Sequence, residues 1–479
     1  MIIIILLLLI IAILSIFFIN RNDHQKIKKI SLLFSFLVLW SSVWLWVIEQ
    51  SKTSYQSTQV LSWLSDNINT SWGPVLFGFD NISFPFILLT NLLIPICIII
   101  SWNTINFLVR EFTICLLLIQ ILLTLVFTSL NLLTFYISFE GILIPMFLII
   151  GIWGSRKEKE RAAYYFFFFT LVGSLFMLLG LFALYNYHGT LDYQILFTRE
   201  TPESLQIWVF LAFFLSLAVK IPKIPVHIWL PQAHVEAPVA GSVLLAGVLL
   251  KLGGYGFIRF SWTLFPYAAN YFSPFIILLS FIAIIYASLT TCRQIDTKKL
   301  VAYSSVAHMG LVVLGIFSKT YEGIIASVLL MVAHGFVSSG LFISVTNLYD
   351  RFHTRVIRYY RGVVYTMPLF TSLFFLLTLS NMAFPITINF IGEFLSILSI
   401  TQTTLLGLIC PLLGMIITGI YSLLLFNKVC FGNPSQYILY PRDLTRREFQ
   451  APLIVLLFTL ALGFTPVLLN NNLILPFIQ

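Results

Sequence analysis

Six ionisable side chains lie inside apolar runs, where charged groups are not expected. They are Glu140, Lys220, Lys251, His308, His334 and Glu393. A charged side chain at the centre of a bilayer costs about 2.5–3.5 kcal/mol on insertion scales, and such residues mark ion pathways, proton relays or ligand sites. Acids, amines and imidazoles together are typical of groups that bind and release protons. These six residues are therefore our candidate proton relay.

Lys220 and Glu393 each lie beside a predicted interruption of a helix. Pro222 and Pro225 follow Lys220, and Pro385 precedes Glu393. Proline removes a backbone donor and clashes with the carbonyl one turn earlier, so both helices should break. Such breaks at membrane depth are tolerated only where they line a cavity or are buried in protein. A lysine held there beside a carboxylate can exchange a proton, because burial disfavours its charge and the acid favours it.

Neighbouring ionisable residues have simpler interpretations. We interpret Lys223 as a lysine that snorkels from a span end towards the headgroups. His234 and Glu236 precede Pro238 at a helix entrance, where a cap or loop contact competes with a role in proton entry. Glu140 has a structural alternative, a carboxyl satisfied by a neighbouring helix.

His308 and His334 occupy two separate apolar helices. Ser304 lies one turn before His308, and Ser338 lies one turn after His334, so each pair shares a helix face. A haem held by two histidines is an alternative, but bis-histidine sites in helical cytochromes usually repeat a pair on each of two helices. Each helix here has a single histidine, which favours hydrogen bonding or proton transfer.

The helices that must position these residues belong to a membrane protein. The chain is 59% hydrophobic and only 9% charged, which excludes a water-soluble domain and a disordered chain. Its net charge of +9 is spread over short connections, so it does not indicate nucleic-acid binding. Five scattered cysteines without a CxxC pair provide no disulfide framework and no zinc or iron–sulfur ligand set.

We predict an all-α integral membrane protein with about fourteen transmembrane helices. The predicted spans lie near 1–19, 30–48, 80–101, 109–129, 132–152, 163–187, 207–230, 235–258, 272–290, 299–317, 322–348, 365–400, 404–427 and 450–470. The first run lacks a basic n-region and a cleavage site, so we expect a retained helix and not a signal peptide.

The distribution of basic residues predicts the orientation of these spans. With the N-terminus outside, the inner connections carry the basic clusters within 21–29, 110, 156–161, 293–299, 351–361 and 428–447. The outer connections hold only Lys52, Arg199, Arg259 and Lys319. This bias follows the positive-inside rule and places both termini outside.

Spans 4–8 and 9–13 resemble each other in the placement of their ionisable groups. Glu140 in span 5 corresponds to His308 in span 10, and Lys220 in span 7 corresponds to Glu393 in span 12. Paired discontinuous helices, here 7 and 12, are the signature of an inverted repeat. We therefore predict two inverted five-helix repeats. The predicted domains are 1–108 (spans 1–3), 109–258, 259–430, and 431–479 (an inner loop and span 14).

The chain resembles the antiporter-like (Mrp-type) membrane-arm subunits of respiratory complex I, the proton-pumping NADH:ubiquinone oxidoreductase. The segments that carry the resemblance are KIPKIPVHIWLPQAHVEAPVAGSVLLAGVLLKLGGYG, QIDTKKLVAYSSVAHMGLV, MVAHGFVSSGLF and NFIGEFLSI. The match covers spans 4–13, most of the chain. It implies that Glu140 and Lys220 form the acid–lysine pair of a first half-channel. Gln232 departs from the charged residue that many relatives have there, which puts proton entry through that loop in doubt.

The same resemblance implies the roles of the other candidates and of the surroundings. Lys251 would be the central connecting lysine, Glu393 the terminal acid of a second half-channel, and His308 and His334 would lie on the axis between them. The chain itself would bind no cofactor, and NADH, FMN, iron–sulfur clusters and ubiquinone would be used in other subunits.

Expected partners are neighbouring antiporter-like subunits, the lateral helix of subunit 5 and membrane lipids, with no nucleic acid. The expected location is the mitochondrial inner membrane, multi-pass and organelle-encoded, with both termini on the intermembrane-space side; a bacterial plasma membrane is the alternative. Three other functions stay open: a free-standing cation/proton antiporter subunit, a haem- or quinone-binding redox subunit and a structural spacer.

Overall fold

The computed structural model of the chain describes residues 2–48, 56–61, 75–403, 405–435 and 442–466. In the first half the elements are α1 (Ile2–Phe17), α2 (His24–Ile48), β1 (Gln56–Leu61), β2 (Val75–Phe79), α3 (Ser83–Thr104), α4 (Val109–Thr128), α5 (Leu132–Gly141), α6 (Leu143–Trp153), α7 (Lys159–His188), α8 (Tyr193–Thr198), α9 (Glu203–Lys220), α10 (Trp229–Glu236), α11 (Val239–Leu244), the π-helix η2 (Leu245–Leu249), α12 (Leu250–Gly256), the π-helix η3 (Phe257–Ser261) and α13 (Trp262–Leu264).

The second half is also helical. Its elements are α14 (Pro266–Cys292), α15 (Thr297–Phe317), α16 (Tyr321–Phe352), the 3-10 helix η4 (Ile357–Tyr359), α17 (Val363–Thr366), α18 (Pro368–Asn381), α19 (Ile388–Thr403), the 3-10 helix η5 (Leu405–Leu408), α20 (Ile409–Cys430) and α21 (Arg446–Phe464).

The prediction of an all-helical membrane protein is confirmed. Among the described residues, 12 helical segments are long and apolar enough to cross a membrane, and α1 and α18 are shorter apolar helices. Large apolar side chains such as Trp44 and Leu179 are exposed, whereas polar side chains such as Asn389 are buried. This arrangement is the one required in lipid, where polar groups must find partners inside the protein. The antiparallel ribbon of β1 and β2 was not predicted.

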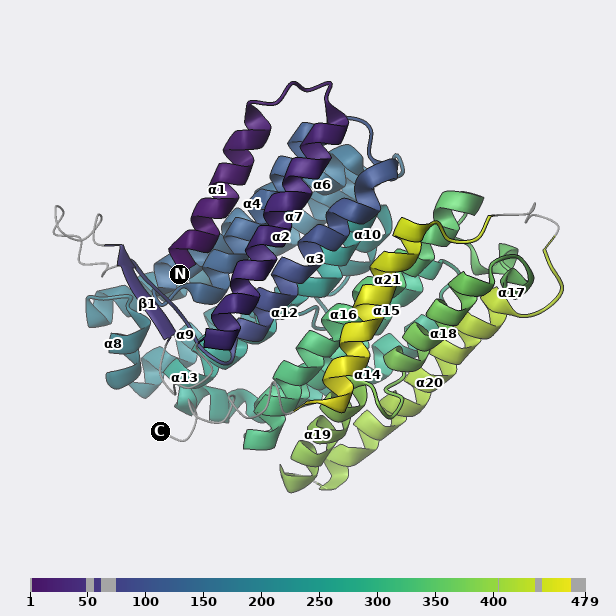
Figure 1. The fold of residues 1–479 in the computed structure, drawn as a ribbon. Coiled ribbons are helices and arrows are strands. Elements are labelled where there is room, and N and C mark those ends of the chain that lie inside the picture. The colour runs from purple at the N-terminus through teal and green to yellow at the C-terminus, as the bar shows by residue number, and fades with distance from the viewer. Residues whose placement is uncertain (1, 49–55, 62–74, 404, 436–441, 467–479) are drawn as a thin grey trace. The chain divides into compact units, whose positions relative to one another are not determined.

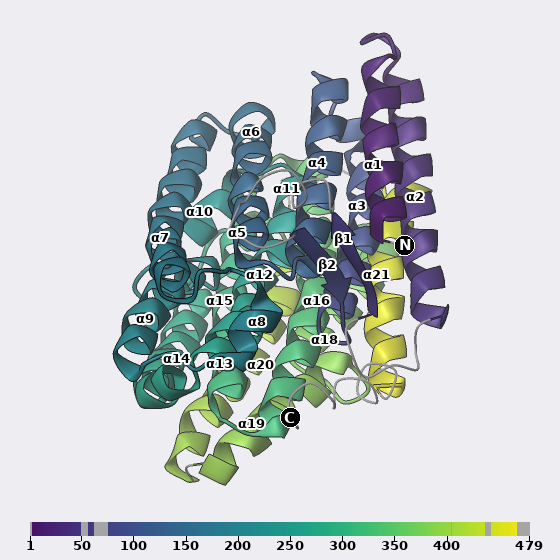
Figure 2. The same ribbon diagram turned by 90° about the vertical axis from the view of Figure 1, so that its left-hand side faces the viewer.

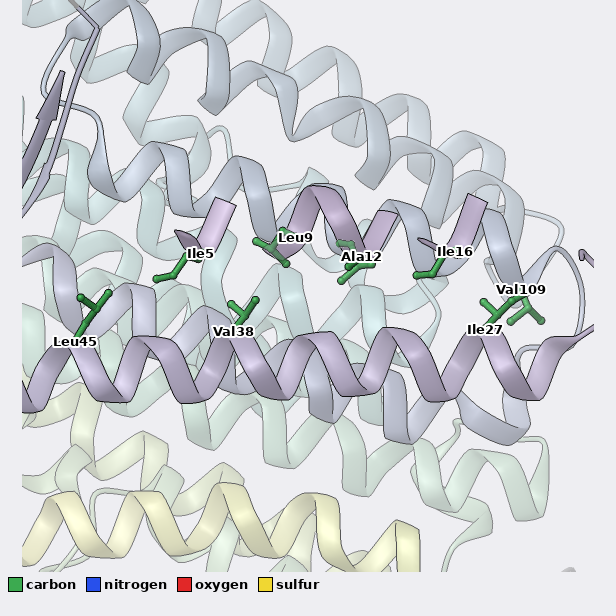
Figure 3. Packing of buried hydrophobic residues seen from close by; sticks show 9 residues of the cluster. Ile5, Leu9, Ala12, Ile16, Ile27, Val38, Leu45 and Val109 are labelled. Carbon is green, nitrogen blue, oxygen red and sulfur yellow. The ribbon is translucent and has the colours of Figure 1, made fainter. Parts of the chain in front are cut away.

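The described residues divide into two compact units. Unit 1 contains residues 2–221 and 248–272, and unit 2 contains residues 222–247 and 273–466. In unit 1, α1 packs on α2, α2 on α3 and α3 on α4 (Figure 1), and α7 lies along α9 (Figure 2). Figure 3 shows the apolar side chains that join α1, α2 and α4, among them Leu9, Val38 and Val109.

In unit 2, α16 packs against α11, α15, α18, α19 and α21. Both α15 and α16 are almost entirely buried, as is the segment Val239–Leu264. Three of the six candidates, Lys251, His308 and His334, lie on these three buried segments, whereas Glu140 and Lys220 lie on segments that are only half buried.

Both predicted helix interruptions are present. The helix α9 ends at Lys220, and α10 begins only at Trp229. Likewise α18 ends at Asn381 and α19 begins at Ile388. At the second break, the Asn389 side-chain amide donates a 2.9 Å hydrogen bond to the carbonyl of Ser380 at the end of α18, which also accepts from Ala383 N at 3.3 Å.

A further interruption, between α5 and α6, was not predicted. Pro145 lies one turn after Gly141, the last residue of α5, and proline disrupts the helix at the carbonyl four residues earlier. Glu140 therefore also lies next to a disturbed helical turn.

A local motif recurs in the two units. Asn131 caps α5 and forms an isolated antiparallel bridge with Asp192, while Asp296 caps α15 and forms the same bridge with Val356. The flanking bonds also match, Tyr193 N to Leu130 O at 2.9 Å and Ile357 N to Ile295 O at 2.9 Å. The helices α5 and α15, which carry Glu140 and His308 in the predicted spans 5 and 10, are thus anchored in the same way.

Some expectations about connections were wrong or lie outside the described residues. Arg259, predicted in an outer loop, is buried in η3, because the helix continues through π turns to Leu264. Lys52, the N-terminal methionine and the C-terminal residues after 466 lie outside the described residues.

Candidate functional site

Unit 1 holds the acid–lysine pair. Lys220 is the last residue of α9, and its side chain is only 3% exposed. Its Nζ lies 4.3 Å from the centre of the Phe139 ring, a cation–π contact that stabilises a buried ammonium. Glu140, the next residue along α5, interacts electrostatically with Lys220, although the two side chains are not in direct ion-pair contact.

Polar neighbours surround the Glu140 carboxyl. The Ser174 hydroxyl of α7 lies in hydrogen-bonding reach of Glu140 and of Tyr136, which is one turn earlier on α5. One oxygen of Glu140, Oε1, has no hydrogen-bond partner among the described residues. A buried carboxylate oxygen without a partner is a position where a proton or a water molecule stabilises the site.

Lys251 is fully buried in α12, between two π-helical turns. Single π turns in long helices widen the backbone and are frequent at functional sites. The helix lies very close to its neighbour at Gly253. A Cβ atom there would lie 2.6 Å from Ile221 Cγ1 and 2.9 Å from the carbonyl oxygen of Leu217. The absence of a side chain therefore lets α12 contact the end of α9 where that helix breaks.

Unit 2 holds three candidates in one contact chain. His308 Nδ1 of α15 lies 3.0 Å from Glu393 Oε1 of α19. The imidazole of His334, on α16, lies 5.5 Å from that of His308 between ring centres. All three side chains are at most 2% exposed. Neither ring nitrogen of His308 and neither oxygen of Glu393 has a well-aligned hydrogen bond among the described residues.

The two serines that were predicted to share a helix face with the histidines donate to backbone carbonyls of their own helices. Ser304 donates to the carbonyl of Val301, and Ser338 donates to the carbonyl of His334 on its own helix. The neighbour that sequence reasoning missed is Tyr421 of α20, a buried phenol that interacts electrostatically with Glu393. Its position 28 residues further along the chain gave no signal of this proximity.

Several residues assigned to connections are buried. Lys223, predicted to snorkel, is 2% exposed, and its Nζ has no hydrogen-bond partner in the described part of the chain. Glu236 is also buried, and its Oε1 lies 3.6 Å from the buried Arg355. Lys298 donates to the carbonyl of Ala237 at 3.2 Å. The contacts of Arg355 and Lys298 hold the interrupted segment around α10, so the charges of these two residues do more than set membrane orientation.

The described residues contain no cluster of three or more His, Cys, Asp or Glu that could hold a metal ion. A cavity of about 540 Å³ in unit 2 is lined mostly by apolar side chains such as Ile277, Leu278 and Phe281. None of the six candidates lines it. The six candidates are instead distributed over separate helices. This distribution suits stepwise proton transfer better than the binding of a bulky solute.

Comparisons with known proteins identify the family. Residues 129–424 match the family described as "NADH:quinone oxidoreductase/Mrp antiporter, TM". NADH-ubiquinone oxidoreductase chain 4 of Metridium senile is 55% identical over 461 residues, which cover 96% of this chain and 94% of that protein.

Solved structures agree. A chain of respiratory complex I from Thermus thermophilus with bound NADH is 28% identical, with a TM-score of 0.89 and coverage of 99% and 97% of the two chains. A chain of the Mrp complex from Dietzia sp. DQ12-45-1b shares the fold, with a TM-score of 0.85, 18% identity and coverage of 98% and 96%. This chain therefore belongs to the NADH:quinone oxidoreductase/Mrp antiporter family, as an antiporter-like membrane subunit of respiratory complex I of the chain 4 type.

Proposed function

We propose that this subunit moves protons across the membrane through its buried ionisable side chains, driven by electron transfer from NADH to ubiquinone in partner subunits. Glu140, Lys220 and Lys251 act in unit 1, and His334, His308 and Glu393 act in unit 2. The observation that carries this proposal is the buried contact chain of Glu393, His308 and His334.

That contact chain has the chemistry of a relay. An imidazole can accept a proton at one nitrogen and donate one from the other. His308 and Glu393 can share a proton, because His308 Nδ1 and Glu393 Oε1 lie within the distance of a hydrogen bond. A purely structural carboxyl would be expected to have its oxygens satisfied by hydrogen bonds. Neither oxygen of Glu393 has a well-aligned hydrogen bond among the described residues.

The Glu140–Lys220 arrangement provides a place where energy can enter. Moving one charge against a membrane potential requires about 2.3 kcal/mol per 100 mV. Burial disfavours the charged form of Lys220, and the electrostatic interaction with Glu140 favours it. A displacement of Glu140 that weakens this interaction would therefore promote release of the lysine proton.

The proposal includes the setting of the subunit. It binds no cofactor itself; NADH, FMN, iron–sulfur clusters and ubiquinone act in other subunits. Its neighbours are antiporter-like subunits and the lateral helix of subunit 5, and it contacts membrane lipids. The membrane is the mitochondrial inner membrane, with both termini on the intermembrane-space side. The two five-helix repeats, 109–258 and 259–430, are inverted copies, which the matching anchors at Asn131 and Asp296 support.

The test is proton pumping by the assembled complex in liposomes. We expect Lys220→Ala and Glu140→Ala to lower NADH-driven pumping or turnover while the complex still assembles. Lys299→Ala, at an exposed position of α15, is the matched control and should leave both unchanged. Full coupled activity in both buried-site variants would refute the relay. Sodium–proton exchange without NADH-dependent activity would favour a free-standing antiporter instead.

A further inference from the structure

A buried ion pair lies in unit 1 outside the candidate relay. Arg259 Nη2 in η3 lies 2.6 Å from Asp80 Oδ1, and the two side chains are 5% and 9% exposed. Asp80 is itself fixed, because Oδ1 accepts from the Ser83 amide at 3.0 Å and its own amide donates to the Ser83 hydroxyl at 2.9 Å. The pair therefore joins the segment after β2 to the end of the helix that carries Lys251.

A tyrosine connects this pair to the face of Lys251. Tyr255 lies one turn after Lys251 on α12, and Arg259 lies one turn further. The Tyr255 hydroxyl accepts from Arg259 Nε at 3.2 Å and donates to the carbonyl of Phe127 at 3.2 Å. The guanidinium also packs against the rings of Tyr193 and Tyr255, at 5.7 and 5.6 Å from their centres.

The chemistry of these groups prevents proton hopping. A hopping chain needs groups that accept one proton and release another. Arginine has five donors and no acceptor, and it does not lose its proton in proteins. The Tyr255 hydroxyl has its proton engaged with Phe127 and an acceptor site engaged with Arg259. A guanidinium in a pore is also an electrostatic barrier to protons and cations.

The location of the cluster formed by Asp80, Arg259 and Tyr255 determines which proton path it would block. In the predicted orientation, the segment before α3 and the end of the span that carries Lys251 both face the outside. The isolated bridge of Phe77 with Ser129 and the contact of α8 with α13 belong to the same end of unit 1 (Figure 2). The cluster thus lies between Lys251 and the outer surface.

We propose that Asp80, Arg259 and Tyr255 form a proton plug that closes the outer end of unit 1. The plug keeps a proton that has reached Lys251 from leaving outward through this unit, and it keeps outside protons from returning through it. This inference rests on the proposed function, in that Lys251 must be reachable by protons from within the protein.

The experiment measures passive proton permeability of liposomes that contain the assembled complex, with an imposed pH gradient and no NADH. Arg259→His replaces the guanidinium by a group that both accepts and donates, and should raise proton permeability several-fold. The double variant Asp80→Asn with Arg259→Gln removes both charges together and should also raise proton permeability. The single variant Asp80→Asn keeps the guanidinium and should leave proton permeability unchanged.

Potassium permeability distinguishes hopping from damage. The proposal predicts that the potassium permeability of every variant stays at the level of the unsubstituted complex. A rise in potassium and proton permeability together, or unchanged proton permeability in both the Arg259→His complex and the doubly substituted complex, would overturn the proposal. Because these measurements need no turnover, a leak in the Arg259→His complex combined with full pumping in the Lys220→Ala complex would uphold the barrier and reject the relay.

Discussion

At the scale of single residues, the candidates share one property: they are ionisable side chains in a protein that is otherwise built to exclude charge. Lys220 is stabilised by the Phe139 ring, and Glu393 is placed against His308. In the second arrangement, neither ring nitrogen of His308 and neither oxygen of Glu393 has a well-aligned hydrogen bond among the described residues. Incompletely satisfied buried groups are costly for stability, so their presence favours a role that requires proton binding and release.

The contact between His308 and Glu393 leads to a prediction about coupling. Because the two side chains touch, His308→Gln and Glu393→Gln should each lower the pumping rate, and the double variant should be little worse than the more severe single variant. The measurement is the NADH-driven pumping rate of the four complexes in liposomes. Strictly multiplicative losses would show that the residues act independently and would contradict a shared proton.

The identity of the buried ionisable residues could be predicted from the sequence, because each stands in an apolar run of spanning length. Their partners could not. Phe139 beside Lys220 and Tyr421 beside Glu393 depend on tertiary packing, for which a single sequence has no signal. Arg259 and Lys298 were assigned to connections because each lies near a predicted span end, yet both are buried with partners. Hydropathy measures the average of a segment and does not detect a charge that is paired inside it.

At the scale of elements, the two helix interruptions could be predicted from prolines, because the loss of a backbone donor is a local effect. The π turns on either side of Lys251 had no such marker, because nothing in LAGVL or FIRFS forbids an ordinary helix. They arise where α12 must fit closely against α9, and this fit depends on glycine.

Two glycine substitutions should therefore have opposite effects. Gly253→Ala places a Cβ against the Leu217 carbonyl and Ile221, and overpacking of this kind costs about 1–3 kcal/mol. We expect less assembled complex and a lower melting temperature. Gly419→Ala, on α20, meets nothing within 4 Å and should be neutral or stabilising, because alanine favours helix by about 1 kcal/mol. Native gels and thermal unfolding check both, and equal behaviour would show that the contact at Gly253 is unimportant.

At the scale of the whole molecule, the fold class was predictable because composition, span count and charge distribution all indicate a multi-pass membrane protein. The family was predictable because the segments around Lys220, Lys251 and Glu393 resemble the antiporter-like subunits of complex I. The 55% identity to NADH-ubiquinone oxidoreductase chain 4 of Metridium senile fixes the assembly to which the chain belongs. The likeness to a chain of the Mrp complex, at 18% identity, establishes a shared fold only. The function of the subunit therefore depends on what its buried charges do inside the assembled complex.

The most direct test is the number of protons pumped per electron by the complex with Lys251→Met in liposomes. Methionine has a similar length and no charge, so it should preserve packing in α12 while removing the buried amine. We expect assembly to persist, and the proton-to-electron ratio or the coupled turnover to fall relative to the exposed control Lys299→Met. An assembled Lys251→Met complex with the unsubstituted ratio and turnover would contradict the account.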